Sequence, residues 1–269
     1  MKPRALTIAG SDPTGGAGIQ QDLKTFETLG VWGLSAVTAV TVQDTAGVRE
    51  WEEVSARTVR AQIDAVMADV GCDAAKTGML GTVEIVDAVA RAATDHLIEQ
   101  LVVDPVLSAG SGDSLARGDL TGAIRELLLP RAALITPNTV EAAALTGLQI
   151  TTVDEQKEAA VALAADGPTA VLVTGGHLGE GSLVTDVLFA DGELHEISSP
   201  RVDGGDVHGT GCALSAAITA LLARGEKIEP AVRRAHALVA DAIARALTLG
   251  KGARLLECAP RSRAGSCPL

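Results

Sequence analysis

Short apolar runs alternate with amphipathic segments along almost the whole chain, and this alternation constrains the fold more than any other feature. Residues 4–10 (RALTIAG) and 34–44 (LSAVTAVTVQD) have the apolar or β-branched character of buried strands. Residues 18–30 and 57–71 instead repeat apolar side chains with helical period, and each ends in glycine. Strands that alternate with helices predict right-handed βαβ units around a mostly parallel sheet. We therefore expect an α/β fold.

Two features add detail to this prediction. Residues 181–198 (GSLVTDVLFADGELHEIS) indicate a small β-hairpin that turns at Asp191 and Gly192. The last part of the chain predicts two long helices, at 211–224 and 229–249. No linker or repeat divides the sequence, so we expect one domain over residues 1–257. Residues 258–269 have no periodicity and predict a flexible C-terminal tail.

The composition excludes some classes of function. The chain of 269 residues has 34 acidic and 22 basic residues, and it has two Trp, two Phe and no Tyr. A nucleic-acid partner is not expected, because basic clusters and stacking aromatics are both missing. No run is apolar enough for a membrane span, and the N-terminal residues do not have the pattern of a signal peptide. Four cysteines without metal-like spacing are typical of a reducing compartment, so we expect a cytoplasmic protein.

Ligands of open α/β sheets bind beyond the carboxyl ends of the strands, so the loops there are the candidate functional segments. The first such loop has glycines at 10, 15, 16 and 18, which allow close approach of the backbone to a ligand. Its spacing matches neither a Rossmann fingerprint nor a P-loop. A tight strand-to-helix turn explains the glycines equally well. Asp22 follows one turn into the next helix, where an acidic residue is commonly a surface charge that favours the helix dipole.

A second candidate segment is TPNTVEAA, residues 136–143. Asn138 and Glu141 fit a capping box at the start of a helix, which would account for both residues. The functional interpretation is that Glu141 holds Mg²⁺ and Asn138 lies near phosphates, since Mg²⁺ commonly combines one carboxylate with waters and ligand phosphate.

The third segment is HGTGCALSAA, residues 208–217. Gly209, Thr210 and Gly211 would direct backbone N–H groups to one point before a helix, which is the arrangement of an anion hole. Cys212 would lie in the first turn, where the helix dipole lowers a thiol pKa. A glycine turn followed by a buried cysteine is the structural alternative.

Five motifs occur together and in order: LTIAGSD with GGAGIQ and DLKT, DPV, LITPN with EA, GGH, and HGTGC with LSAAI. Together they resemble the hydroxymethylpyrimidine and phosphomethylpyrimidine kinases of thiamine biosynthesis, in the ribokinase-like superfamily. The resemblance covers residues 4 to about 252. It implies a three-layer α/β/α fold with a central, mostly parallel sheet. It also implies transfer of phosphate from ATP, with Mg²⁺, to 4-amino-5-hydroxymethyl-2-methylpyrimidine and then to its monophosphate.

The resemblance also implies roles for individual residues. The anion hole of Gly209, Thr210, Gly211 and Cys212 would stabilise the transferring phosphoryl group, with Cys212 where related kinases have an aspartate base. Glu141 would order Mg²⁺. The substrate pocket would draw on Gly10, Asp22, Gln43, Met79 and Val106, and the phosphates of the nucleotide on Asn138, Thr174 and His208.

The sequence departs from the family pattern at two places. Thr174 stands before GGH where the family usually has lysine, and the C-terminal end lacks the usual GHG stretch. His177 and Lys251 are further candidates for phosphate contact. The alternatives are a pyridoxal or pyridoxine kinase of the same superfamily and a non-catalytic pyrimidine- or nucleotide-binding regulator. The family also implies a homodimer.

Overall fold

A computed structural model describes the chain except for residues 111, 177, 179–180, 203–205 and 259–269. The described part forms a sheet of nine strands in the order β3-β2-β1-β4-β5-β6-β7-β8-β9. The strands from β2 to β7 are parallel, while β3, β8 and β9 join antiparallel at the two edges. Their bounds are β1 Arg4–Ser11, β2 Trp32–Asp44, β3 Gly47–Glu53, β4 Ala74–Thr77, β5 Leu101–Val103, β6 Leu134–Ile135, β7 Ala170–Val173, β8 Leu183–Ala190 and β9 Glu193–Pro200.

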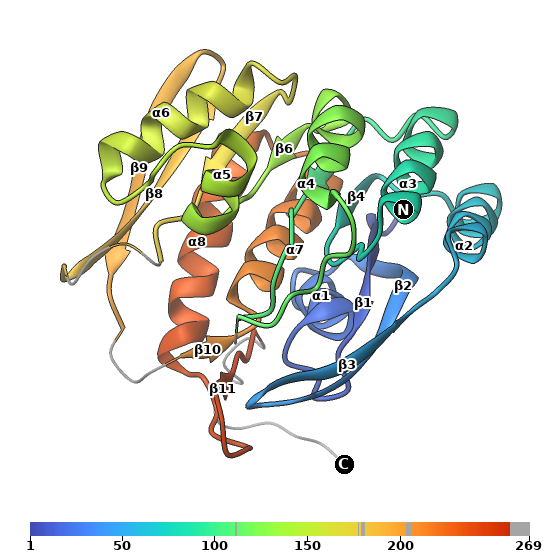
Figure 1. The fold of residues 1–269 in the computed structure, drawn as a ribbon, viewed down its shortest axis with the longest axis horizontal. Helices are drawn as coiled ribbons and strands as arrows, with labels where there is room; N and C mark the ends of the chain where they lie inside the picture. Colours follow the sequence, from blue (N-terminus) through green and yellow to red (C-terminus); the bar gives the residue numbers. More distant parts are fainter. Residues whose placement is uncertain (111, 177, 179–180, 203–205, 259–269) are drawn as a thin grey trace.

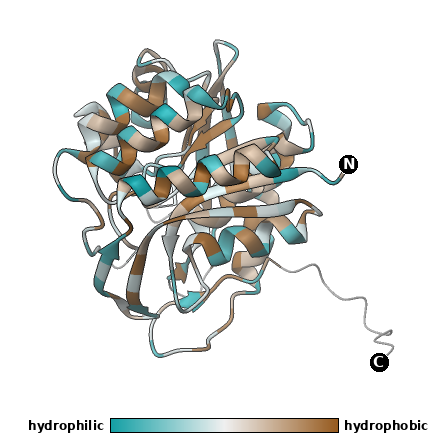
Figure 2. Ribbon diagram, turned by 90° about the vertical axis from the view of Figure 1, so that its right-hand side faces the viewer, coloured by the Kyte–Doolittle hydropathy of each residue, from teal (hydrophilic) through white to brown (hydrophobic). Residues whose placement is uncertain are grey.

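Helices cover both faces of the sheet, which makes three layers (Figure 1). Buried strands have apolar side chains on both faces, and β5 shows the pattern. Val103 packs with the helices of one layer and Val102 with those of the other. Figure 2 shows hydrophobic residues along the strands and mixed with hydrophilic ones along the helices. The first layer contains α2 (Ala56–Asp69), α3 (Val83–Asp95), α4 (Leu120–Ala123), α5 (Thr139–Thr146) and α6 (Val153–Ala164), and the second contains α1 (Gly18–Thr28), α7 (Thr210–Ala223) and α8 (Ile228–Ala244).

The predicted α/β class, with its mostly parallel sheet and hairpin, is therefore confirmed. The hairpin of β8 and β9 turns at Asp191 and Gly192, whose φ angles of 53° and 80° are those of a turn that matches strand twist. Strand β3 was not predicted, because its sequence GVREWEE is polar and it lies at an edge of the sheet. In the described part, no helix is long and apolar enough to cross a membrane.

The end of the chain differs from the prediction. Helix α8 stops at Ala244 rather than at residue 249, because the following residues turn back along the molecule. There Arg254–Leu255 (β11) pairs with Val207–His208 (β10), just before α7. Cys258, the first residue of the expected tail, is buried and accepts a hydrogen bond from Gln21. The other residues of the expected tail lie outside the described part of the chain.

One backbone contact positions the start of α7. Gly209 has a φ of +85°, and a Cβ atom there would lie 1.8 Å from the carbonyl oxygen of Gly16. The loop before α7 is therefore packed against the loop between β1 and α1 at a distance that only glycine permits. Gly211, two residues further on, has open space at its Cβ position.

We expect Gly209→Ala to lower the free energy of unfolding by about 1–3 kcal/mol, because it combines a left-handed φ with a backbone clash. Gly211→Ala is the matched control and leaves stability equal or slightly higher, as alanine is the better helix former. Urea denaturation followed by circular dichroism measures both variants. Equal stability of the two would show that the loops do not depend on this contact.

Candidate active site

A cavity of about 960 Å³ opens at the carboxyl end of the parallel strands. This volume is at the upper end of the range of small-molecule sites, and it suffices for two small ligands side by side. The loops after β1, β4, β5, β6 and β7 and the start of α7 all reach it. Among the residues that line it are Gly10, Gln43, Met79, Val106, Asn138, Glu141, Thr174, His208, Gly209, Thr210, Gly211 and Cys212. Of the residues to which the resemblance gives a role, the structure thus brings together all except Asp22.

Asp22 lies below the cavity and not at its surface. Its side chain is fully buried, accepts a hydrogen bond from Thr7 Oγ1 at 2.6 Å, and pairs with Lys76 Nζ at 2.9 Å. It is therefore neither a residue of the cavity wall nor the surface charge that the sequence also allowed. The reason is that position 22 of α1 faces β1 and β4, whereas the ligand side of the helix is its N-terminal end.

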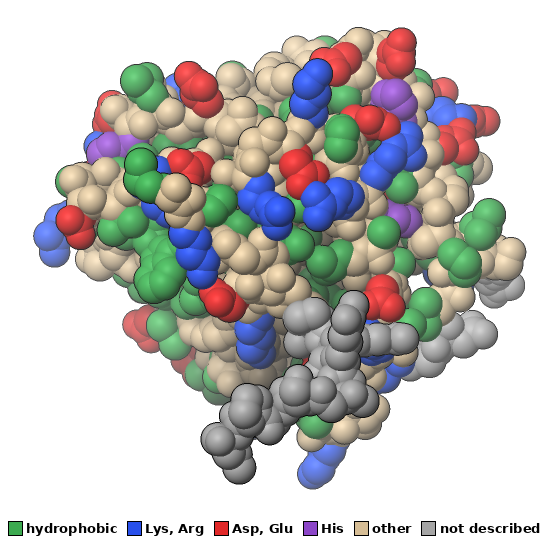
Figure 3. All heavy atoms as spheres, turned by 180° about the vertical axis from the view of Figure 1, so that it is seen from behind, with side chains coloured by type: hydrophobic (Ala, Val, Ile, Leu, Met, Phe, Trp, Pro, Cys, Tyr) green, Lys and Arg blue, Asp and Glu red, His purple; other side chains and the backbone are tan. Residues whose placement is uncertain are grey.

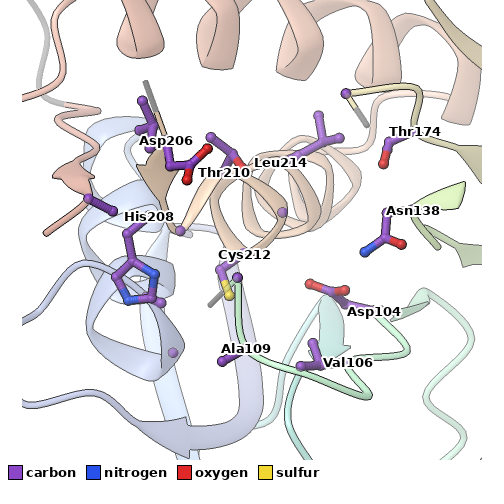
Figure 4. A pocket seen from close by; sticks show the side chains of 18 of the residues that line it. Asp104, Val106, Ala109, Asn138, Thr174, Asp206, His208, Thr210, Cys212 and Leu214 are labelled. Carbon is purple, nitrogen blue, oxygen red and sulfur yellow. The ribbon is translucent and has the colours of Figure 1, made fainter. Parts of the chain in front are cut away.

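Helix α7 presents its N-terminus to the cavity (Figure 4). Gly209 is the N-cap in left-handed conformation, and no side chain caps the helix. The first N–H groups of a helix have no partner within it, and here they are also free of a side-chain cap. Together with the macrodipole they favour an anion at this point. The predicted anion hole thus has the required local structure.

Cys212 extends from the first turn of α7 into the cavity (Figure 4). Burial raises the pKa of its thiol to about 12, and the carboxylates of Asp22 and Asp104 add to this, while Lys76 opposes it. The expectation of a thiol pKa lowered by the helix is therefore wrong. Desolvation and two neighbouring carboxylates outweigh the favourable helix end, so the thiol is neutral at physiological pH.

Asn138 and Glu141 form the predicted capping box at the start of α5. Asn138 Oδ1 accepts from the N–H groups of Val140 and Glu141, and the N–H of Asn138 donates to Glu141 Oε2 at 2.9 Å. Both residues also line the cavity, so the structural and functional interpretations are compatible. Burial raises the pKa of Glu141 to about 8, with a further contribution from the charge of Asp104.

The two buried carboxylates Asp104 and Glu141 provide a test of whether a cation suits this place. Each is at least nine-tenths shielded from water, and the charge of Asp104 raises the cost of charge on Glu141. A divalent cation would offset that cost, so the residues fit Mg²⁺. No cluster of three or more His, Cys, Asp or Glu side chains suited to a metal occurs in the described part. The protein would then supply few ligands and leave the others to water and phosphate.

Asp12 organises the first loop, and the sequence interpretation missed it. Its carboxylate accepts from the N–H groups of Thr14 and Ala17 and contacts His208 Nε2 at 3.0 Å. Burial opposes ionisation of Asp12, but the hydrogen bonds from His208 and Thr14 prevail and hold its pKa below the usual range. His208 Nε2 also lies 2.9 Å from the side-chain nitrogen of Gln43. His208 thus joins the first loop to β2, in addition to lining the cavity.

One wall of the cavity is apolar, as expected for a surface that contacts the face of an aromatic ring. Met79 belongs to a small apolar cluster against which Val106 packs. Gly10 completes this wall, and a Cβ atom there would lie 3.1 Å from Met79 Sδ. Gln43 adds an amide at the rim, with Oε1 accepting from Thr41 Oγ1 at 3.2 Å.

The part of the cavity that is lined by the ends of β7 and β8 contains residues that no motif indicated. Asp186 Oδ1 accepts from the N–H of Gly175 at 2.9 Å, and Asp186 Oδ2 lies 3.6 Å from His236 Nε2. Thr174 lines the cavity, but its neutral side chain does not supply the positive charge of the lysine that the family usually has at this position. Lys251 is exposed and does not line it, and His177 lies outside the described residues. Asp104 could have been found from the DPV motif, whereas Asp186 and His236 come from segments without a motif.

Comparison with solved structures relates this arrangement to a vitamin kinase. The chain superposes on the pyridoxal kinase of Staphylococcus aureus in complex with AMP-PCP and pyridoxal, with a TM-score of 0.90 and 31% sequence identity. The match covers 98% of this chain and 96% of that one. Fold and cavity together define a small-molecule phosphotransferase with the ribokinase-like arrangement.

The chain belongs to the phosphomethylpyrimidine kinase family, whose model matches residues 12–257. It is 44% identical over 249 residues to the hydroxymethylpyrimidine/phosphomethylpyrimidine kinase of Bacillus subtilis, covering 93% of this chain and 92% of that protein. It is also 42% identical over 247 residues to a thiamine biosynthesis bifunctional protein of Geobacter sulfurreducens, covering 92% of this chain and 50% of that protein. The resemblance inferred from the five motifs is confirmed.

The raised pKa of Glu141 predicts a pH-dependent stability. Between pH 4.5 and about 8 the folded protein holds a proton on Glu141 that the unfolded chain releases, so this group makes the protein less stable as the pH rises. We expect Glu141→Gln, which keeps the hydrogen-bond acceptor, to gain stability relative to the natural protein from pH 5 to 8, by an amount of the order of a few kcal/mol. Thermal and urea denaturation across this range measure the difference.

Glu155 is the matched control for this experiment. It occupies the same capping-box position in α6, but it is exposed, and its hydrogen bonds with Thr151 hold its pKa below the usual value. Above pH 5, the free energy of unfolding of Glu155→Gln should therefore change with pH in the same way as that of the natural protein. If the stability of Glu141→Gln also followed that of the natural protein across this pH range, the proposed protonation of Glu141 would be contradicted.

Proposed function

We propose that the protein transfers the γ-phosphoryl group of ATP to the hydroxymethyl group of 4-amino-5-hydroxymethyl-2-methylpyrimidine, and then a second phosphoryl group to the monophosphate, in thiamine biosynthesis. The observation that carries the proposal is the helix N-terminus of α7, which has no side-chain cap and faces a cavity of about 960 Å³. Membership of the phosphomethylpyrimidine kinase family supports the choice of substrate.

The pyrimidine ring would lie in the apolar part of the cavity. Met79 and Val106 would contact its faces, and Gly10 would keep the wall low enough for the ring to enter. Gln43 offers one acceptor and two donors in a plane, which suits an amino group beside a ring nitrogen. This arrangement would orient the hydroxymethyl group toward Cys212 and the start of α7.

The nucleotide would occupy the other half of the cavity, toward Asn138, Thr174 and Asp186. The N–H groups of Thr210, Gly211 and Cys212 would stabilise charge on the phosphoryl group as it moves, which is the main requirement of phosphoryl transfer. Glu141 would hold Mg²⁺, which neutralises phosphate charge when bound.

The proton of the substrate hydroxyl must leave during the transfer. Burial keeps the thiol of Cys212 neutral before the reaction, so Cys212 acts as a contact of the hydroxyl group rather than as a thiolate formed in advance. The carboxylate of Asp104 lines the same cavity and is available to receive the proton. Burial raises the pKa of Asp104, which makes it a stronger base than an exposed aspartate.

The chain would act as one domain over residues 1–257, as a homodimer in the cytoplasm, with ATP and Mg²⁺ and without nucleic acid. The exposed Val40 and Val42 of β2 are apolar surface that a second copy could cover. On the face shown in Figure 3, acidic and basic side chains are intermingled and form no basic patch.

A substrate panel with ATP and Mg²⁺ tests the proposed function. We expect both the monophosphate and the diphosphate of the pyrimidine to accumulate, because one cavity holds either acceptor next to the anion hole. Chromatography of the products distinguishes the two steps. The likeness to a pyridoxal kinase favours pyridoxal as the second candidate substrate. Equal or better kcat/KM with pyridoxal would overturn the first choice.

The role of Cys212 can be tested by Cys212→Ser. We expect kcat to fall at least about 10-fold with the fold unchanged, because a hydroxyl group is smaller than the thiol and contacts the substrate less closely. Cys72→Ser is the matched control, since Cys72 is also a half-buried free cysteine but lies outside the cavity. Turnover of Cys212→Ser at the level of Cys72→Ser would show that Cys212 only packs.

A further inference from the structure

Lys76 is a fully buried lysine directly beneath the cavity. It lies on β4, in the middle of the sheet, and its side chain has no exposed surface. A lysine is seldom buried unless its charge is paired. Its Nζ pairs with Asp22 Oδ1 at 2.9 Å and lies 4.0 Å from Asp104 Oδ2. The charge is therefore shared between a carboxylate inside the protein and a carboxylate of the cavity wall.

Neutral hydrogen bonds hold the two carboxylates from the outer sides. Thr7 Oγ1 donates to Asp22 Oδ2 at 2.6 Å, and Ser215 Oγ donates to Asp104 Oδ2 at 2.8 Å. Ser215 lies on α7, one turn after Cys212, and Thr7 lies on β1. The network thus links β1, α1, β4, the residue that follows β5, and α7.

A purely structural role explains this network poorly. Buried ion pairs are costly to desolvate, and apolar side chains of similar volume often give equal or greater stability. Here one ammonium group faces two carboxylates, so the arrangement is not even neutral. Only Asp104 of the three groups reaches the cavity, and it does so with Oδ2 oriented toward Lys76 and Ser215.

We propose that Lys76 is a positioning residue for phosphoryl transfer, whose ammonium group holds the Asp104 carboxylate in place at the cavity wall beside Cys212. This inference rests on the proposed function for its kinetic consequence. Asp22 is the second partner of Lys76 and fixes the position of its ammonium group. The hydrogen bond from Ser215 to Asp104 Oδ2 fixes the orientation of the Asp104 carboxylate. The substrate hydroxyl then meets a carboxylate with a fixed orientation.

Three variants distinguish the positioning of Asp104 by Lys76 from simple neutralisation of buried negative charge by Lys76. In the natural protein the trio Lys76, Asp22 and Asp104 carries a formal charge of −1. Lys76→Met leaves −2, Asp22→Asn leaves zero, and the double variant restores −1 without a cation next to Asp104. We expect the double variant to regain thermal stability relative to Lys76→Met, while its kcat stays about 10- to 100-fold low, with a smaller change in KM. Asp22→Asn removes one partner of Lys76 but leaves its ammonium group facing Asp104, so its kcat should fall less than that of the double variant.

The result that overturns the proposal is a double variant with the kcat of the natural protein, since Lys76 would then serve only to neutralise Asp22. Failure of Lys76→Met alone to fold does not affect this comparison, because the double variant removes the unpaired Asp22 charge.

A second measurement does not require the substrate, so it separates this proposal from the proposed function. Iodoacetamide labelling at pH 8, followed by peptide mass spectrometry, reports the reactivity of Cys212. Lys76 favours the thiolate of Cys212, so Lys76→Met should slow labelling of Cys212 several-fold while that of Cys72 stays the same. Unchanged labelling of Cys212 would contradict the placement of Lys76 beside it. A natural protein that labels as expected but phosphorylates no pyrimidine would overturn the proposed function alone.

Discussion

The close approach of two loop backbones through glycine is the constraint on which the site depends. Gly209 meets the carbonyl of Gly16, and Gly18 lies in the same way against the carbonyl of Gly10, where a Cβ atom would be 2.4 Å away. These contacts place the N-termini of α1 and α7 together at the carboxyl edge of the sheet. A side chain at position 209 would push α7 away from the loop before α1, and one at position 18 would push the start of α1 away from the end of β1. The glycines are thus structural residues whose effect is to locate the N-terminus of α7, where we propose the anion hole.

The cavity placed in this way has an unusual balance of charge. Asp104, Glu141 and Asp186 are buried carboxylates that line it, while the buried cation Lys76 lies beneath it. Burial raises the pKa of each carboxylate, so negative charge on these groups is costly. A site of this kind gains free energy when a cation enters, and an anion then has a place at the helix N-terminus. A nucleotide with a bound metal ion would supply both the cation for the carboxylates and the anion for the helix N-terminus.

Much of the site could be predicted because its parts are local. The capping box of Asn138 and Glu141, the glycine loop before α7 and the turn at Asp191 follow from short-range backbone hydrogen bonding, which the neighbouring sequence specifies. The family motifs then located the cavity wall at Gln43, Met79 and Val106. Asp22 illustrates the limit. Its position in the motif was recognised, but whether it faced the ligand or the core depended on the rotation of α1 against β1.

The pKa of Cys212 illustrates the same limit for chemistry. The helix N-terminus is visible in the sequence and favours a thiolate, whereas desolvation and the carboxylates of Asp22 and Asp104 depend on distant segments that meet only in the fold. The ion pairs of Lys76 likewise join residues 54 and 28 positions apart in the chain. The sequence by itself determined the alternation of strands and helices, the local caps and turns, and the family. Only the tertiary structure decided which charges are buried together, because electrostatic energies depend on distance and on exclusion of water rather than on order along the chain.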